Sequence, residues 1–422
     1  MAFSGRFGPL QERPFRLVWL ARTSSAFGDA LIPVALAFAV LDVGGSATRL
    51  GLVLASFTIA RVAFTLAGGV WADRLPRRLV MIASDVVRAA VDAFTAFALI
   101  SGFMTFWMFL ATAATFGAAS AFFGPASTGL VPQTVSPARL QKANALLGLT
   151  QSATSLFGPA VSGLLVATVG PGWVFGIDSA SFVASAGFLV ALRIPHAARA
   201  VSENFLRELV DGWREVTSRS WLWKSFVVFA LGNLGGAGIW VLGPLVAQRS
   251  LGGAGAWGII LTGQAAGGIL GGTLAYRLHP RRPLVAAFGA WLLTCLPLLA
   301  LAPPLPTLLI AAAGAAFALG ITFGNTIWET MLQQQIPAAA LSRVTSYDLL
   351  LSFVFIPIGS AAAGPLADGI GLRATLLASA ALIVVVNAGI FLVPSVRRLE
   401  APQPSSWAEG GSRGPAPRDP LP

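Results

Sequence analysis

Apolar residues run along this chain in blocks of about twenty, separated by short polar or charged segments. Each block is long enough to cross the roughly 30 Å hydrocarbon core of a bilayer as a helix. Such segments must be helical, because lipid cannot hydrogen-bond to free backbone groups. The pattern predicts twelve spans, at 16–41, 48–71, 79–101, 105–129, 141–168, 173–193, 223–248, 255–276, 283–302, 305–331, 345–368 and 373–394.

Composition and charge agree with a membrane protein. Hydrophobic residues make up 55% of the chain and charged residues 11%, whereas a soluble domain carries about 25% charged residues. The net charge of +11 comes from arginines that gather in alternate loops, as they do on the cytoplasmic side of membranes. We therefore expect a multi-pass protein of the cell (inner or plasma) membrane with both termini cytoplasmic, and no nucleic-acid partner.

The second half of the chain repeats features of the first, roughly 200 residues later. Phe27-Gly28-Asp29 matches Leu231-Gly232-Asn233, and the basic hairpin at 69–78 matches the one at 272–282. Two parallel six-helix halves are the plan of one transporter class. We expect halves at 1–193 and 223–394, a cytoplasmic linker with an amphipathic helix at 194–222, and a disordered tail at 395–422.

Several motifs carry a family resemblance that covers nearly the whole chain. Gly69-x-x-x-Asp73-Arg74-x-x-Arg77-Arg78 resembles the signature between the second and third spans of the major facilitator superfamily. Gly158-Pro159, followed by Gly163, is similar to the fifth-span motif of its antiporter-type members. Phe123-Gly124-Pro125-Ala126 and Trp328-Glu329-Thr330 resemble the subgroup that includes the enterobactin exporter and macrolide efflux proteins.

The resemblance implies an all-α integral membrane protein with the major facilitator fold. It also implies a proton-coupled exporter, an antiporter of drug-like or siderophore-like small molecules that works by alternating access. Two alternatives stay open, namely an importer or lipid flippase of the same fold, and a non-transporting membrane sensor or scaffold. The expected partners are a small-molecule substrate, protons and the lipid bilayer, and the expected state is a monomer.

Neither a cofactor nor an enzyme activity is expected. No Gly-x-x-x-x-Gly-Lys-Ser/Thr motif for nucleotide phosphates is present. One cysteine, Cys295, and two histidines, His196 and His279, give no metal-site spacing and no nucleophile with a base.

Ionisable residues deep in the spans are candidates for proton coupling, because a charge at that depth is costly unless it is paired or wet. In a major facilitator fold the first span lines the central cavity, whereas the third and sixth lie outside it. The resemblance therefore favours Asp29 as the protonated residue, with Arg61 as the partner that protonation releases. A permanent structural pair is the alternative. Glu329, near the cytoplasmic end of the tenth span, is the third candidate.

Glu329 could receive protons, bind a cationic group, or form a gate ion pair with Arg139 or Arg343. The third span also carries charges, with Asp85, Arg88 and Asp92 at i, i+3 and i+7 on one helical face. That spacing predicts that they neutralise one another. We interpret these three residues, and Asp178 in the sixth span, as structural.

Two further groups are candidate sites. The basic hairpins predict a cytoplasmic latch between the halves, formed by Gly69, Asp73, Arg74, Arg77, Arg78 and Arg277, although the arginines could serve only to fix the topology. A cavity for drug-like cargo should be aromatic and apolar with a few polar groups. The candidates for its lining are Arg22, Phe27, Asn233, Trp240 and Trp328, and for each of them packing in the core or against lipid is the alternative.

Overall fold

The computed structural model describes residues 8–44, 46–72, 76–193 and 213–399, and these fold into helices. The first group of helices is α1 (Arg13–Asp29), α2 (Ile32–Gly44), α3 (Ala47–Ala72), α4 (Arg77–Ile100), α5 (Phe106–Leu130), α6 (Leu140–Val169) and α7 (Pro171–Ala191). The second is α9 (Ser220–Val246), α10 (Ala254–Arg277), α11 (Pro283–Trp291), α12 (Leu296–Leu301), α13 (Thr307–Gln335), α14 (Ala338–Phe353), α15 (Ile356–Ile370) and α16 (Leu372–Gly389). Short helical turns and α17 (Pro394–Arg397) complete the described chain.

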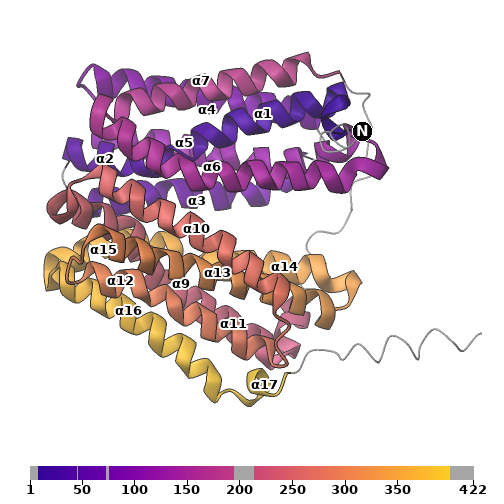
Figure 1. Cartoon of the computed structure of the whole chain (residues 1–422), viewed down its shortest axis with the longest axis vertical. Helices are drawn as coiled ribbons and strands as arrows, with labels where there is room; N and C mark the ends of the chain where they lie inside the picture. The colour runs from indigo at the N-terminus through magenta and orange to yellow at the C-terminus, as the bar shows by residue number, and fades with distance from the viewer. Residues whose placement is uncertain (1–7, 45, 73–75, 194–212, 400–422) are drawn as a thin grey trace, which may run out of the picture.

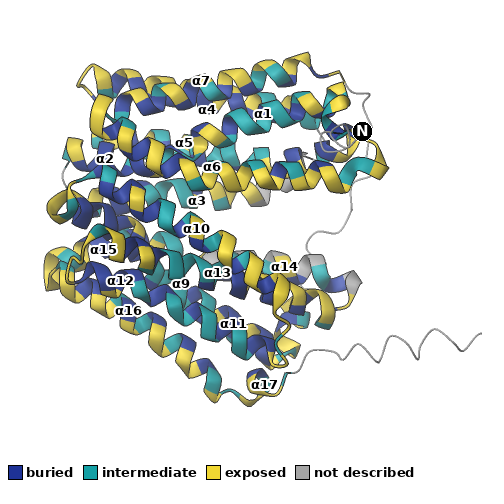
Figure 2. Cartoon of the chain, in the orientation of Figure 1, coloured by how far each residue is buried: buried dark blue, intermediate teal, exposed yellow. Residues whose placement is uncertain are grey.

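Twelve spans account for these helices. Eleven segments of the described chain are long and apolar enough to cross a membrane. The twelfth is α4, which has the length of a span but carries three charged residues in its interior, Asp85, Arg88 and Asp92. The predicted all-α fold is confirmed. Large apolar side chains such as Phe97 and Val385 are exposed, and lipid would cover them. Exposed positions, drawn in yellow, follow the outer helices α7 and α16 (Figure 2).

Some boundaries differ from the prediction. α9 begins at Ser220, inside the predicted linker 194–222, because Trp221 and Leu222 are buried against the second half. The first span divides into α1 and α2, and the eleventh into α14 and α15. Most of the predicted amphipathic helix lies at 194–212 and most of the predicted tail at 400–422, which are outside the described residues.

The two groups of helices form two bundles that meet at one end (Figure 1). At the end distant from the N-terminus, one cluster of buried apolar side chains includes Phe38 of the first bundle and Trp257 of the second. Toward the N-terminal end each bundle has its own cluster, and the ribbons diverge there (Figure 1). The structure is therefore closed at the distal end.

Polar contacts and close backbone approaches complete the distal closure. Thr48 Oγ1 donates to Asp368 Oδ2 at 3.1 Å, which joins α3 to α15. Gln248 Nε2, in the turn after α9, donates to Asp42 Oδ1 of α2 at 3.0 Å. Glycines let α6 and α10 touch, because a Cβ added at Gly258 would lie 2.5 Å from the Pro159 carbonyl oxygen.

Candidate functional site

The first span breaks immediately after Asp29, the last residue of α1. Pro33 has no N–H to donate to the carbonyl of Asp29, so the helix cannot continue regularly through this point. The chain turns at Ala30 and Leu31, and Ser162 Oγ of α6 donates to the Leu31 carbonyl at 2.6 Å. The break thereby ends a helix deep in the bundle and places a carboxylate there.

Asp29 is ion-paired to Arg88 of α4. Arg88 Nη1 lies 3.5 Å from Asp29 Oδ2, and Arg88 is 3% exposed whereas the Asp29 side chain is 44% exposed. Arg88 Nη2 also donates to buried Asp85 Oδ1 at 2.5 Å. The guanidinium lies over the rings of Phe123 and Phe182, 4.4 and 4.1 Å from the ring centres. Arg88 is therefore held by the Asp85 carboxylate and two aromatic rings, and it presents its charge to Asp29.

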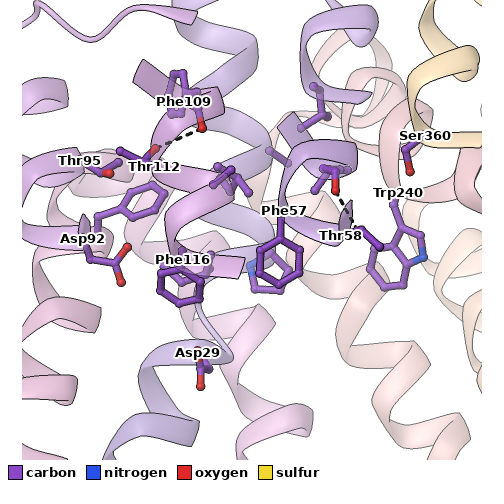
Figure 3. A pocket seen from close by; sticks show the side chains of 18 of the residues that line it. Asp29, Phe57, Thr58, Asp92, Thr95, Phe109, Thr112, Phe116, Trp240 and Ser360 are labelled. Carbon is purple, nitrogen blue, oxygen red and sulfur yellow. Dashed lines mark hydrogen bonds between the residues drawn. The ribbon is translucent and has the colours of Figure 1, made fainter. Parts of the chain in front are cut away.

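Asp29 faces a cavity of about 350 Å³. Its wall is mostly aliphatic and aromatic, with Phe57, Phe116 and Trp240 among the side chains that Figure 3 labels. Asp29 and Asp92 are the charged residues among those that line it. An apolar wall with few convergent polar groups is typical of sites for small organic molecules.

The cavity lies mainly within the first bundle. α1 to α5 and α7 supply most of its lining, and Trp240, Trp257, Ile356 and Ser360 come from the second bundle. The third and sixth spans, expected outside the central cavity, contribute Asp92 of α4 and Phe175 of α7 to this cavity.

Arg88, rather than Arg61, forms the ion pair with Asp29 in this structure. Arg61 of α3 does not approach Asp29 within 4 Å, and its guanidinium lies 5.9 Å from the centre of the Phe57 ring. The predicted neutralisation within α4 is confirmed for Asp85 and Arg88, which are 2.5 Å apart. Asp92, by contrast, turns toward Asp178 of α7.

One of the five predicted cavity residues, Trp240, lines the cavity. Trp328 does not: it is 4% exposed in the core of the second bundle, where its Nε1 donates to Asp348 Oδ2 at 2.8 Å. Asn233 Nδ2 donates to the Ser352 carbonyl at 2.8 Å. Arg22 is half-buried and Phe27 is exposed, and neither is among the residues that line this cavity.

Asp348 of α14 is a half-buried carboxylate that was not among the residues predicted from the sequence. It accepts from Trp328 and from Ser352 Oγ at 3.0 Å. The sequence places this carboxylate three residues inside the predicted eleventh span, and that position could have marked it as an ionisable residue within the bundle. Glu329 is exposed on α13 and lies outside the cavity. Arg139, one predicted partner of Glu329, instead contacts Glu12 at 3.3 Å.

The basic hairpin is described in part. Gly69 lies in α3, and Asp73 and Arg74 lie outside the described residues. Arg77 donates to the Gly129 carbonyl of α5, and Arg78 donates to the Leu189 and Val190 carbonyls near the end of α7, both at 2.7 Å. These bonds stay within the first bundle. Arg277 is exposed at the end of α10, and the latch between halves stays a prediction.

The fifth-span motif lies where three helices meet. A Cβ added at Gly158 would lie 2.5 Å from the Ala30 side chain, at the break in the first span. A Cβ at Gly163 would lie 2.7 Å from the Ala254 carbonyl oxygen of α10. Gly158, Pro159 and Gly163 thus bring α6 against the break on one side and against the second bundle on the other.

Known proteins resemble this chain over nearly its full length. Residues 4–410 match the family described as transmembrane secretion effector. The multidrug efflux pump Tap of Mycolicibacterium fortuitum is 28% identical over 408 residues, which cover 92% of this chain and 97% of the relative. Macrolide efflux protein A of Streptococcus pyogenes is 23% identical over 393 residues, with 92% and 97% covered.

Solved transporters share the fold. A bacterial homologue of the iron transporter ferroportin, in an inward-facing state, has a TM-score of 0.71 at 18% identity and covers 92% of this chain and 99% of its own. The nucleoside transporter NupG has a TM-score of 0.72 at 14% identity, with 92% and 99% covered. From the family match and the fold together, the chain belongs to the transmembrane secretion effector family of major facilitator transporters.

Proposed function

We propose that this transporter is a proton-coupled exporter that moves drug-like small molecules by alternating access. One observation supports this most directly: the Asp29 carboxylate is exposed in an apolar cavity and is paired with a buried arginine. Protonation of Asp29 removes its charge, so the attraction to Arg88 is lost. A cavity that holds either a proton or a cargo molecule at this carboxylate can exchange one for the other.

The apolar wall favours drug-like cargo over siderophore-like cargo. A lipophilic cation suits the cavity best, because its apolar body matches the aromatic wall and its charge matches Asp29. Efflux relatives, one of them named as a pump for many drugs and another for macrolides, support the outward direction. A scaffold that does not transport has no use for a carboxylate in an apolar cavity, so this arrangement also favours a transporter.

The orientation of the chain in the membrane decides which side the open end faces. With both termini in the cytoplasm, as the loop arginines predict, the closed distal end faces outward. The described structure is then the state that receives cargo from the cytoplasm. Opening the α3–α15 and α6–α10 contacts, while the bundles approach at the other end, would release the cargo outside.

The Asp29→Asn variant tests proton coupling. Export of a fluorescent lipophilic cation driven by a pH gradient in inside-out vesicles should be lost, because the amide cannot take up a proton. Downhill exchange of the same cation should persist at a reduced rate. The fold should tolerate the change, because Asn233 occupies the matching position of the second half.

The same vesicles separate the alternatives. Gradient-driven export that continues unchanged in Asp29→Asn would contradict the assignment of Asp29. Cells that make the parent protein should become more resistant to a toxic cation, and greater sensitivity would instead indicate an importer. Transport of no compound in either direction would favour the sensor or scaffold.

A further inference from the structure

Two buried carboxyl groups contact each other beside the cavity. Asp92 of α4 is 2% exposed and Asp178 of α7 is 0% exposed, and their side chains are within hydrogen-bonding contact. Ionised carboxylates only accept hydrogen bonds, so this contact needs a proton on one of the two. Oδ2 of Asp92 and Oδ2 of Asp178 are buried and accept no hydrogen bond from a donor in the described part of the chain.

Arg88 is the cation that acts on Asp92, but its ion pairs are with other carboxylates. α1 contributes Asp29 and α4 contributes Asp85 and Arg88, whereas α5 has no ionisable residue and Asp178 is the only one in α7. Arg88 is already bound to Asp85 and Asp29. Ser181 Oγ donates to Asp178 Oδ1 at 3.1 Å, but a hydroxyl brings no charge. A proton is therefore the counter-charge that the site can hold.

The pair has a route to the cavity and to Asp29. Asp92 lines the cavity together with Val91 and Thr95 of the same helix. Asp178 lies directly against Gly28, the neighbour of Asp29, where an added Cβ would collide with the Asp178 carboxyl group. Figure 3 shows Asp29 and Asp92 on the wall of one pocket. Asp29 and the pair thus lie next to each other and open onto the same cavity.

We propose that the coupling proton is stored by the Asp92–Asp178 carboxyl pair, and that Asp29 exchanges it with the cavity. The inference rests on the proposed function, since it names the residues that hold the proton of that exchange. One O–H bond breaks at the pair and one forms at water or at Asp29, so no other reactant is needed. Cargo at Asp29 then blocks the exit of the stored proton until the bundles rearrange.

Infrared spectra of the parent and its variants, compared as purified proteins in lipid nanodiscs, test the protonation of the pair independently of transport. At neutral pH the parent should show the C=O stretching band of a protonated carboxyl group. Asp92→Asn and Asp178→Asn should each lose that band, because the amide donates the hydrogen bond in place of the proton. Asp29→Asn should keep it. The band surviving in both pair variants would overturn the proposal.

Ser179→Ala is the matched control for the packing of α4 against α7. Ser179 Oγ donates to the Ala89 carbonyl at 2.8 Å, so this variant weakens the same interface but keeps both carboxyl groups and should keep the band. Asp92→Asn and Asp178→Asn each remove the proton shared by the pair, so the test can be made with either variant if only one of them folds.

Transport separates this inference from the proposed function. In proteoliposomes, Asp92→Asn and Asp178→Asn should lose cation transport driven by a pH gradient and retain downhill exchange. If both variants transport the cation in response to the pH gradient as the parent does, storage of the proton at the pair is refuted. Proton-coupled export by the protein would still stand. If cation transport by the parent protein does not depend on the pH gradient, the proposed function itself is refuted.

Discussion

Replacing Arg88 by methionine should strongly destabilise the first bundle. The substitution leaves Asp85, which is completely buried, without its 2.5 Å partner, and leaves Asp29 without its ion-pair partner. Removing one member of a buried ion pair costs about 3–5 kcal/mol. The contacts with the Phe123 and Phe182 rings are weakened as well. The thermal unfolding temperature in detergent, followed by tryptophan fluorescence, should drop sharply.

A second substitution distinguishes charge from packing. Adding Asp85→Leu to Arg88→Met removes the unpaired buried carboxylate, so much of the lost stability should return. Proton-driven transport should not return, because Asp29 still lacks its partner. An Arg88→Met protein as stable as the parent would show that the ion pairs do not hold these helices together.

The second large effect is expected at the contact between α6 and α10. In Gly258→Ala the new Cβ would lie 2.5 Å from the Pro159 carbonyl oxygen and 3.2 Å from the Gly163 Cα. Overpacking of this kind costs about 1–3 kcal/mol, which shifts a two-state equilibrium by about 5- to 150-fold. The distal closure should open, and cargo export should fall accordingly.

Gly255→Ala is the matched control, because a Cβ there meets no atom within 4 Å. Both substitutions gain the same helix propensity. Closure can be measured by disulfide formation in a Thr48→Cys/Asp368→Cys pair, whose parent side chains are hydrogen-bonded, with Cys295 replaced by serine. Equal cross-linking in Gly258→Ala and Gly255→Ala would contradict the importance of this contact.

The hydrophobic pattern predicted the spans well because a bilayer imposes both their length and their helical state. It also predicted which ionisable residues lie deep. Counting residues gives depth along a helix, but it does not give the direction in which a side chain points. Arg61 and Arg88 lie at similar depth, and only packing shows that Arg88 is the one turned toward Asp29.

The same ambiguity explains the other differences. Trp328 is on a helix of the class that lines cavities, yet Asp348 accepts its indole N–H inside the core. Asp92 shares a helical face with Arg88 by spacing, but it contacts Asp178 on another helix. Pro33 can be read from the sequence, whereas the break that it produces also depends on Ser162 and Gly158 of α6.

The break after Asp29 also fixes the length of the first span. α2 is held to α6 through Leu31, and α6 touches Ala30 and the second bundle within two turns. One residue inserted between Gly28 and Pro33 would displace α2 relative to α1, because the chain is held on both sides of the break. Phe38 would then leave the cluster that joins the bundles. Related chains can therefore vary the side chains of this segment far more easily than its number of residues.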